Sequence, residues 1–169
     1  LLASTEAFGS ADARTVRFDY DLNNRAVSRT DAQGNVQAYE YDAVGNRLRM
    51  VDGRGNATNY VYDARDRLVR SIDPLNFETR VEYDGVGNRI ALVDARGGIT
   101  RLAYDPGNRL VQTTDAEGRV SRFEYDVRGN LLSVTYHDGS VERFEPSPTT
   151  NAVDATTNRR NQETQFTYD

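Results

Sequence analysis

The chain of 169 residues carries 21 Lys and Arg against 26 Asp and Glu, which gives a net charge of −5. Its cations are nearly all Arg and are spread evenly, which argues against a nucleic-acid-binding surface, since such surfaces cluster Lys and Arg. The absence of Cys excludes a disulfide framework, a thiolate metal site and a cysteine nucleophile. No apolar run approaches the ~18 residues that a membrane-spanning helix needs.

Residues 1–12 show no periodic pattern, and we predict an irregular N-terminal segment there. They also lack the basic start and the apolar stretch of a signal peptide. Because the sequence opens without Met and ends on TYD, the beginning of another repeat, we expect it to be a section of a longer protein.

Between residues 13 and 145 the sequence repeats itself. A Tyr-Asp pair returns every 21 residues, six times in phase. A fixed period of this size is the signature of a repeat architecture, in which each unit stacks on its neighbours. The pairs that open repeats one to six are Tyr20 and Asp21, Tyr41 and Asp42, Tyr62 and Asp63, Tyr83 and Asp84, Tyr104 and Asp105, and Tyr125 and Asp126.

Each repeat carries two turn signals. The first turn begins at the Asp of the pair, and the second begins ten residues later, at an Asp that is followed three residues on by Gly. Asp caps such a turn by accepting a hydrogen bond from the backbone N–H two residues on, and Gly tolerates a left-handed backbone. In repeat three Asn76 replaces Gly, and Asn tolerates the same conformation. The second-turn residues are Asp31, Asp52, Asp73, Asp94 and Asp115, with Gly34, Gly55, Gly97, Gly118 and Gly139.

Two strands per repeat fit between these turns. The segment 119–125 alternates Ser121, Phe123 and Tyr125 with charged residues, which is the period of a half-buried strand. The strand after it places Leu132 and Val134 on one side. No segment shows a sustained helical period, because Gly, Asn and Asp turn residues return about every ten residues. We therefore predict an all-β chain of tandem 21-residue β-hairpins that form a curled antiparallel sheet, since open sheets of more than about ten strands rarely stay flat.

The 21-residue repeat pattern is interrupted after Glu145. Pro146 stands where the next Tyr is due, and we predict that residues 146–163 form a loop or a degenerate repeat. Residues 164–169 resume the strand pattern as the start of the next repeat. Tyr168 lies 43 residues after Tyr125, which is two periods plus one.

The first turns also alternate in composition. Repeats two and four read Gly-Asn-Arg at 45–47 and 87–89, whereas Arg25, Arg67 and Arg109 come one position earlier in repeats one, three and five. We interpret this super-period of 42 residues as an alternation between two turn lengths.

No catalytic residue, metal site or cofactor is predicted. His137 is the only His, and without a second His or a Cys it builds neither a zinc site nor a His-dependent triad. The repeated Asp residues sit at turn positions, and the nine-residue calcium-binding repeat is absent. We therefore assign them a structural role. The Tyr side chains leave two interpretations open, namely packing between strands and an exposed platform for a ligand.

The phrases YDAVGNRL, DGRGNATNYVYD, YDGVGNRI and DAEGRVSRFEYD resemble the YD repeats of the RHS (rearrangement hotspot) family. The resemblance covers residues 13–145 well and residues 164–169 in part. In that family the repeats form β-hairpins that spiral into a hollow shell, so the resemblance implies an arc of such a shell. The family's self-cleaving region, marked by D-P-x-G, lies beyond its repeats. Asp73 and Asp105 precede Pro here but are in repeat phase, so no protease role is carried onto them.

The resemblance also implies a function. In bacterial members the shell encloses a C-terminal toxin, while teneurins use a similar barrel in cell adhesion and some members are thought to bind carbohydrate. We therefore expect a structural section of a secreted or cell-surface bacterial shell, and not an enzyme. The expected partners are the rest of its own shell and an enclosed C-terminal effector domain, with no nucleic acid and no membrane span. The alternative is a cell-surface module for adhesion or glycan binding.

Overall fold

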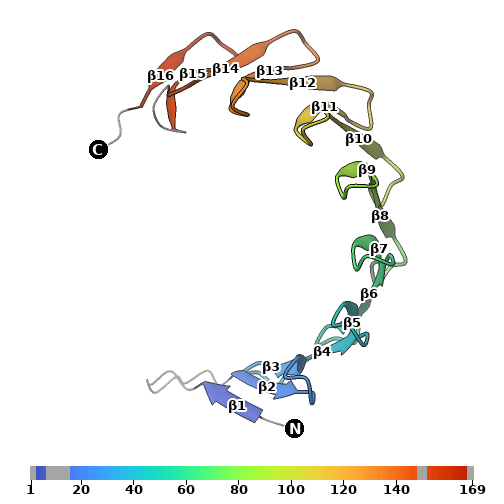
Figure 1. Cartoon of the computed structure of the whole chain (residues 1–169). Helices are drawn as coiled ribbons and strands as arrows, with labels where there is room; N and C mark the ends of the chain where they lie inside the picture. The colour runs from blue at the N-terminus through green and yellow to red at the C-terminus, as the bar shows by residue number, and fades with distance from the viewer. Residues whose placement is uncertain (1–2, 7–15, 148–151, 167–169) are drawn as a thin grey trace. The chain divides into compact units, whose positions relative to one another are not determined.

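The computed structural model describes residues 3–6, 16–147 and 152–166, and no helix occurs in these ranges. All of their regular structure is β-strand, paired antiparallel between neighbours in the chain (Figure 1). The prediction of an all-β array of tandem hairpins is therefore confirmed. The chain divides into two compact units, Leu1–Arg80 and Val81–Asp169, with the division inside strand β8 (Glu78–Tyr83).

The first unit contains seven complete strands, which pair in chain order. They are β1 (Ala3–Glu6), β2 (Val16–Tyr20), β3 (Ala26–Thr30), β4 (Val36–Tyr41), β5 (Arg47–Val51), β6 (Ala57–Tyr62) and β7 (Leu68–Ile72). The second unit contains eight strands after β8. They are β9 (Arg89–Val93), β10 (Ile99–Tyr104), β11 (Leu110–Thr114), β12 (Val120–Tyr125), β13 (Leu131–Thr135), β14 (Val141–Pro146), β15 (Val153–Thr157) and β16 (Glu163–Gln165).

Both turns of a repeat have one geometry. In the second turn of repeat one, the N–H of Asp31 donates to the carbonyl of Asn35 at 3.0 Å, and the N–H of Gly34 donates to the carbonyl of Asp31 at 2.9 Å. The fourth residue of such a turn has a left-handed backbone, with φ of 83° at Gly34 and 64° at Asn76. Because Gly, Asn and Asp accept this conformation most readily, they mark the turns in the sequence.

Five of the six repeated Tyr residues lie opposite a bulge, namely Tyr20, Tyr41, Tyr62, Tyr104 and Tyr125. The register shifts between Glu40 and Tyr41, and again between Glu124 and Tyr125, so that the strand after the first turn contains one extra residue. A bulge locally disrupts the ladder and increases the twist of the strand. The Tyr side chain is therefore positioned by the backbone just before every first turn whose register is described.

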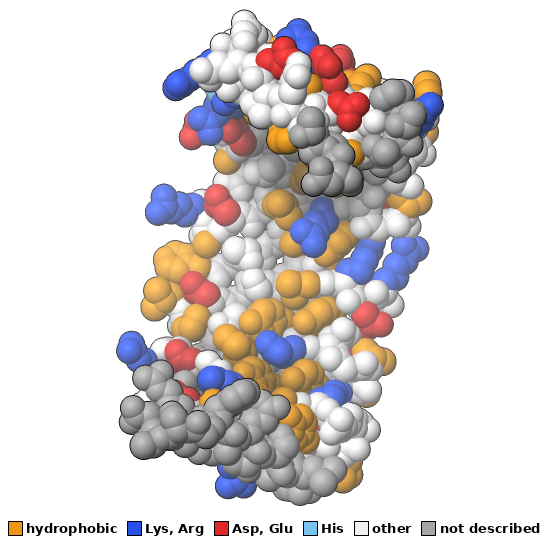
Figure 2. Space-filling view, turned by 90° about the vertical axis from the view of Figure 1, so that its left-hand side faces the viewer, with side chains coloured by type: hydrophobic (Ala, Val, Ile, Leu, Met, Phe, Trp, Pro, Cys, Tyr) orange, Lys and Arg blue, Asp and Glu red, His pale blue; other side chains and the backbone are white. Residues whose placement is uncertain are grey.

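The strands form a single layer with little interior. Ser121, Phe123 and Tyr125 are half-buried on β12, whereas Arg122 is exposed. Phe123 pairs across the sheet with Val134, which is only 6% exposed. None of the described side chains is fully buried. Figure 2 shows one face, where hydrophobic side chains gather along the middle of the strands and charged ones lie mainly toward the margins.

The two ends differ from the simple repeat. Strand β1 falls within residues 1–12, where we expected an irregular segment, and it pairs with β2. The remainder of that segment lies outside the described residues. Residues 146–163 contain β15, which pairs with β14 and then with β16. The turn between β14 and β15 closes from the N–H of Ser147 to the carbonyl of Ala152, one residue further than the equivalent bond from Asp126 to Asn130. This inserted residue accounts for the spacing of two periods plus one.

Candidate functional site

The repeated turns concentrate the polar contacts of the chain. In the first turn of repeat one, Oδ1 of Asp21 accepts hydrogen bonds from the backbone N–H groups of Asn23 and Arg25, both at 2.9 Å. Its second oxygen accepts from Nε of Arg25 at 2.7 Å. One carboxylate thus satisfies three donors, and a charged acceptor makes these bonds stronger than neutral ones.

The residues singled out from the sequence occupy equivalent places in every repeat. The six Tyr residues end strands β2, β4, β6, β8, β10 and β12, and the Asp after each opens the first turn. Five further Asp residues open the second turns after β3, β5, β7, β9 and β11. The glycines with left-handed backbone in the second turns are Gly34, Gly55, Gly97, Gly118 and Gly139.

The six repeated Tyr side chains are half-buried, and three of them make equivalent hydrogen bonds. The hydroxyl of Tyr41 donates to the carbonyl of Ala26 at 2.9 Å, and that of Tyr125 donates to the carbonyl of Leu110 at 2.9 Å. Tyr62 makes the equivalent bond to Arg47 at 3.1 Å. Each of these bonds joins a Tyr to the strand before it. The geometry supports packing between strands as the role of the repeated Tyr residues.

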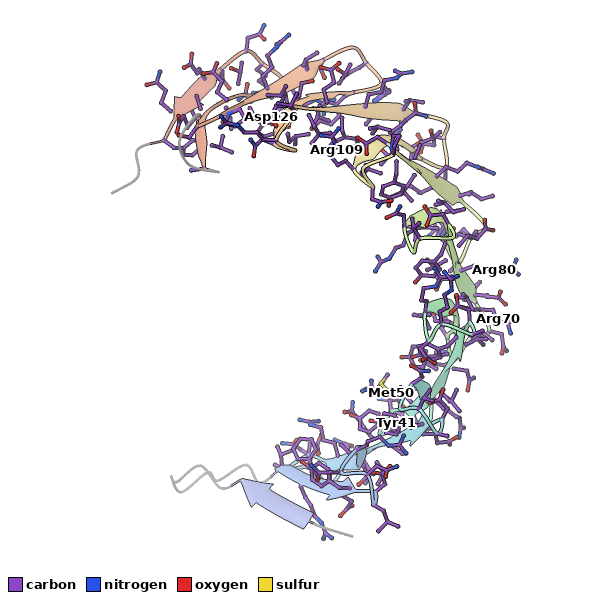
Figure 3. All side chains as sticks on the ribbon, viewed as in Figure 1. Tyr41, Met50, Arg70, Arg80, Arg109 and Asp126 are labelled. Atoms are coloured by element: carbon purple, nitrogen blue, oxygen red, sulfur yellow. The ribbon has the colours of Figure 1, made fainter. Side chains whose placement is uncertain are left out.

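An arginine ties the first turn of an odd repeat to the next repeat. Besides Asp21, Arg25 donates from Nη1 to the carbonyl of Asp42 at 2.7 Å, and its guanidinium lies 4.9 Å from the ring centroid of Tyr41. Arg109 does the same in the second unit, donating to the carbonyl of Asp126 at 3.0 Å (Figure 3). Its guanidinium lies 5.2 Å from the ring of Tyr125. We call this arrangement the arginine clasp.

An asparagine replaces the arginine in even repeats and makes a smaller tie. Nδ2 of Asn46 donates to its own turn carboxylate, Asp42, at 2.9 Å, and to Oδ1 of Asp66 in the next first turn at 2.8 Å. In the second unit Asn88 donates in the same way to Asn108, at 2.9 Å. We call this arrangement the asparagine clasp.

The interpretation of the 42-residue super-period as two turn lengths was wrong. First turns of both kinds close between the same positions, from the Asp N–H to the carbonyl four residues on. What alternates is the residue at that fifth turn position, which is Arg in odd repeats and Asn in even ones. The super-period of 42 residues therefore reflects the alternation of the arginine clasp and the asparagine clasp between neighbouring turns.

The turn hydrogen bonds lower the pKa of many of the turn aspartates. The side-chain hydrogen bond from Arg67 is the main cause at Asp63, whose pKa falls to about 2. The side chain of Asn35 is the main cause at Asp31, whose pKa is also lowered. Lowered pKa values are found as well at Asp21, Asp42, Asp52, Asp84, Asp94, Asp105, Asp115 and Asp126.

These lowered pKa values predict acid sensitivity in one pH window. A carboxylate whose pKa is lower in the folded chain stabilises the fold above its unfolded pKa of about 3.9, and this stabilisation is lost as the pH falls through the folded value. We expect the urea midpoint to stay level from pH 7 to about 5 and to fall between about pH 4 and 2. Asp63→Asn keeps the oxygen acceptor and should lower the midpoint at pH 7 while flattening the acid fall. A fall that is already complete by pH 5 would contradict the assignment to these aspartates.

The aspartates do not gather into a metal site. Within residues 3–6, 16–147 and 152–166, no three His, Cys, Asp or Glu side chains are grouped so that they could hold a metal ion. The same ranges contain no helix that is long and apolar enough to cross a membrane.

The family of the chain follows from a comparison with known families. The family model of the RHS repeat matches residues 20–57, 62–99, 83–120 and 104–141, which together make up more than half of the sequence. The chain belongs to the RHS repeat family. No curated protein matches it as a relative.

Solved structures with the same fold are toxin-complex proteins. The chain is similar to the structure of TcdB2-TccC3, with a TM-score of 0.69 and 16% identity over 84% of this chain and 9% of that one. It is also similar to the Photorhabdus luminescens Tc holotoxin pore with the TccC3 D651A mutation, with a TM-score of 0.60 and 18% identity over 85% of this chain and 10% of that one. The chain thus spans about a tenth of these solved chains, and the likeness concerns the fold.

Proposed function

We propose that this chain is a structural section of an RHS-type shell wall, which encloses a C-terminal toxin or effector domain of a secreted bacterial protein. The observation that carries the proposal is the single layer of hairpins, with no fully buried side chain in its described part and with clasps between neighbouring first turns inside each unit. Such a layer suits a wall, because each hairpin is held by its neighbours and the array can be extended by repetition.

The shell role also fits the chemistry of the repeated residues. Their carboxylates are used in capping backbone N–H groups, and the hydroxyls of Tyr39, Tyr41, Tyr62, Tyr125 and Tyr136 donate to backbone carbonyls or to Glu and Gln side chains. These contacts stabilise structure, and the Asp residues that open the described turns are engaged with the turns themselves, so we assign the chain no enzymatic role. Its proposed partners are the rest of the shell and the enclosed domain.

The test uses limited proteolysis of the full-length protein. A protease of broad specificity is added under native conditions, and the segment that follows the repeats is monitored by mass spectrometry. We expect this segment to survive native digestion and to be lost after mild denaturation. The same segment, produced alone, is the control for intrinsic resistance and should be digested quickly.

One result would overturn the enclosing role. If the segment is digested at once while the repeats persist, the repeats enclose nothing. Saturable binding of glycans to the intact protein would then favour the alternative, a cell-surface module for adhesion or carbohydrate binding.

A further inference from the structure

A hollow of about 520 Å³ lies between two neighbouring second turns of the second unit. One wall comes from the turn of repeat five, including Glu117 and Arg119, and from Arg122 on β12. The other wall comes from Thr135 at the end of β13 and from the turn that follows, with Tyr136 and His137. The volume is in the range of small-molecule sites.

The repeat pattern breaks at this hollow. The second turn opens with Asp in repeats one to five, but with Tyr136 in repeat six. The lost cap is partly restored by Asp138, which accepts hydrogen bonds from the backbone N–H of Ser140 at 2.9 Å and from its hydroxyl at 2.6 Å. Departures from a local rule are expected at functional positions, where a side chain serves something other than the fold.

Tyr136 is held rigidly in its unusual position. Its hydroxyl donates to Glu142 at 2.9 Å, and the guanidinium of Arg159 lies 3.8 Å from its ring centroid. Arg159 also pairs with Asp138 at 3.1 Å. The acidic side chains around Tyr136 are therefore already engaged by donors of the chain itself.

Two cationic or donor side chains in the hollow remain available. Arg122 and His137 are exposed, and neither side chain has a hydrogen bond or an ion pair within the part of the chain that the structure describes. Glu117 pairs with Arg119, whose Nη1 lies 2.9 Å from it and whose Nε also pairs with Asp115 at 2.6 Å. The hollow thus offers a guanidinium fork, an imidazole and the hydroxyl of Thr135, and its one lining carboxylate is ion-paired with Arg119.

We propose that this hollow binds a small oxyanion, a phosphate or carboxylate group, through Arg122 and His137. The planar guanidinium matches the oxygens of either group with two parallel hydrogen bonds. The imidazole supplies a further donor from the opposite wall. The ligand class is thus a small phosphorylated or carboxylated molecule, and the site is independent of the enclosing role proposed above.

The sole His makes the test direct. Inorganic phosphate is titrated into the intact chain at pH 7 and constant ionic strength, with chloride as the replaced anion, and the ring signal of His137 is followed by proton NMR. We expect a saturable shift, and about a tenfold weaker affinity in Arg122→Gln, since a hydrogen bond to a charged group is lost. Acetate, titrated in the same way, shows whether a carboxylate is preferred over phosphate.

The matched control is Arg101→Gln. Arg101 is exposed and occupies the same strand position one repeat earlier, but it does not line the hollow. It should leave the affinity for phosphate unchanged. A shift that never saturates, or an equal loss in both variants, would show general screening by anions and overturn the proposal. Arg122→Lys, which keeps the charge without the fork, should bind with intermediate affinity.

Discussion

Replacing Tyr41 by Ala is expected to destabilise the fold by about 2–3 kcal/mol. The side chain is half-buried, its hydroxyl donates to the carbonyl of Ala26 at 2.9 Å, and Arg25 lies 4.9 Å from its ring. The substitution removes all three contributions at a bulge where the backbone ladder is already interrupted. The measurement is urea unfolding of the intact chain.

Two further variants separate the contributions of this Tyr. Tyr41→Phe keeps the ring and should cost about 1 kcal/mol, the typical value of one hydrogen bond. Val44→Ala, in the turn that follows, truncates a side chain that is 72% exposed and should change the stability by no more than about 0.5 kcal/mol. An unchanged slope with urea would show that the compactness of the denatured state is the same in all variants. Equal losses for Tyr41→Ala and Val44→Ala would refute a structural role for the repeated Tyr.

The hairpin array could be predicted because its signals are local. The turn that opens at Asp31 and reaches its left-handed residue at Gly34 is defined by the chemistry of five neighbouring residues. Alternation along the strand from Val120 to Tyr125 likewise depends on residues that are adjacent in the chain. Repetition of these signals then fixed the order of the strands, since each hairpin pairs with the next.

The clasps could not be predicted because they join turns that are distant in the sequence. Arg25 reaches a carbonyl 17 residues away, and Asn46 reaches a side chain 20 residues away. Their alternation is visible in the sequence, but its meaning depends on how closely successive turns stack. Without that distance, the shift of Arg by one position was interpreted as a change of turn length.

Residues 146–163 were ambiguous for a different reason. The repeat continues there, but its marker residues are replaced, with Pro146 in the place of Tyr and Asn158 in the place of the second-turn Asp. Oδ1 of Asn158 accepts from the backbone N–H groups of Arg160 and Gln162, as the aspartates do in their turns. The geometry of the turn is thus kept by a neutral residue that carries a weaker sequence signal.

The two kinds of clasp predict that neighbouring repeats are joined with unequal strength. Arg109→Gln removes the ion pair with Asp105, the hydrogen bond to the carbonyl of Asp126 and the contact with the ring of Tyr125. We expect a loss of about 1–2 kcal/mol, mainly from the charged hydrogen bond to Asp126 and the cation–π contact, because a partly exposed ion pair contributes little. Asn88→Ala removes the hydrogen bonds of its amide to Asn108 and to Asp84 and should cost about 1 kcal/mol. Both variants lie in the second unit, so their effects are measured on the unfolding of the same compact unit.

Hydrogen exchange and a double-mutant cycle locate the effect. Arg109→Gln should speed amide exchange in the turn that begins at Asp126, whereas Asn88→Ala should speed it in the turn that contains Asn108. Combining Arg109→Gln with Tyr125→Leu should give a coupling energy of about 0.5–1 kcal/mol, while Arg101→Gln with Tyr125→Leu should give none. If Arg109 and Tyr125 show no coupling energy and the amides of both turns exchange as fast as in the unmodified chain, the arginine clasp does not stabilise the contact between neighbouring turns. If the coupling is found, the array is built from pairs of hairpins, and it should open first at the asparagine clasps, which join the pairs to one another.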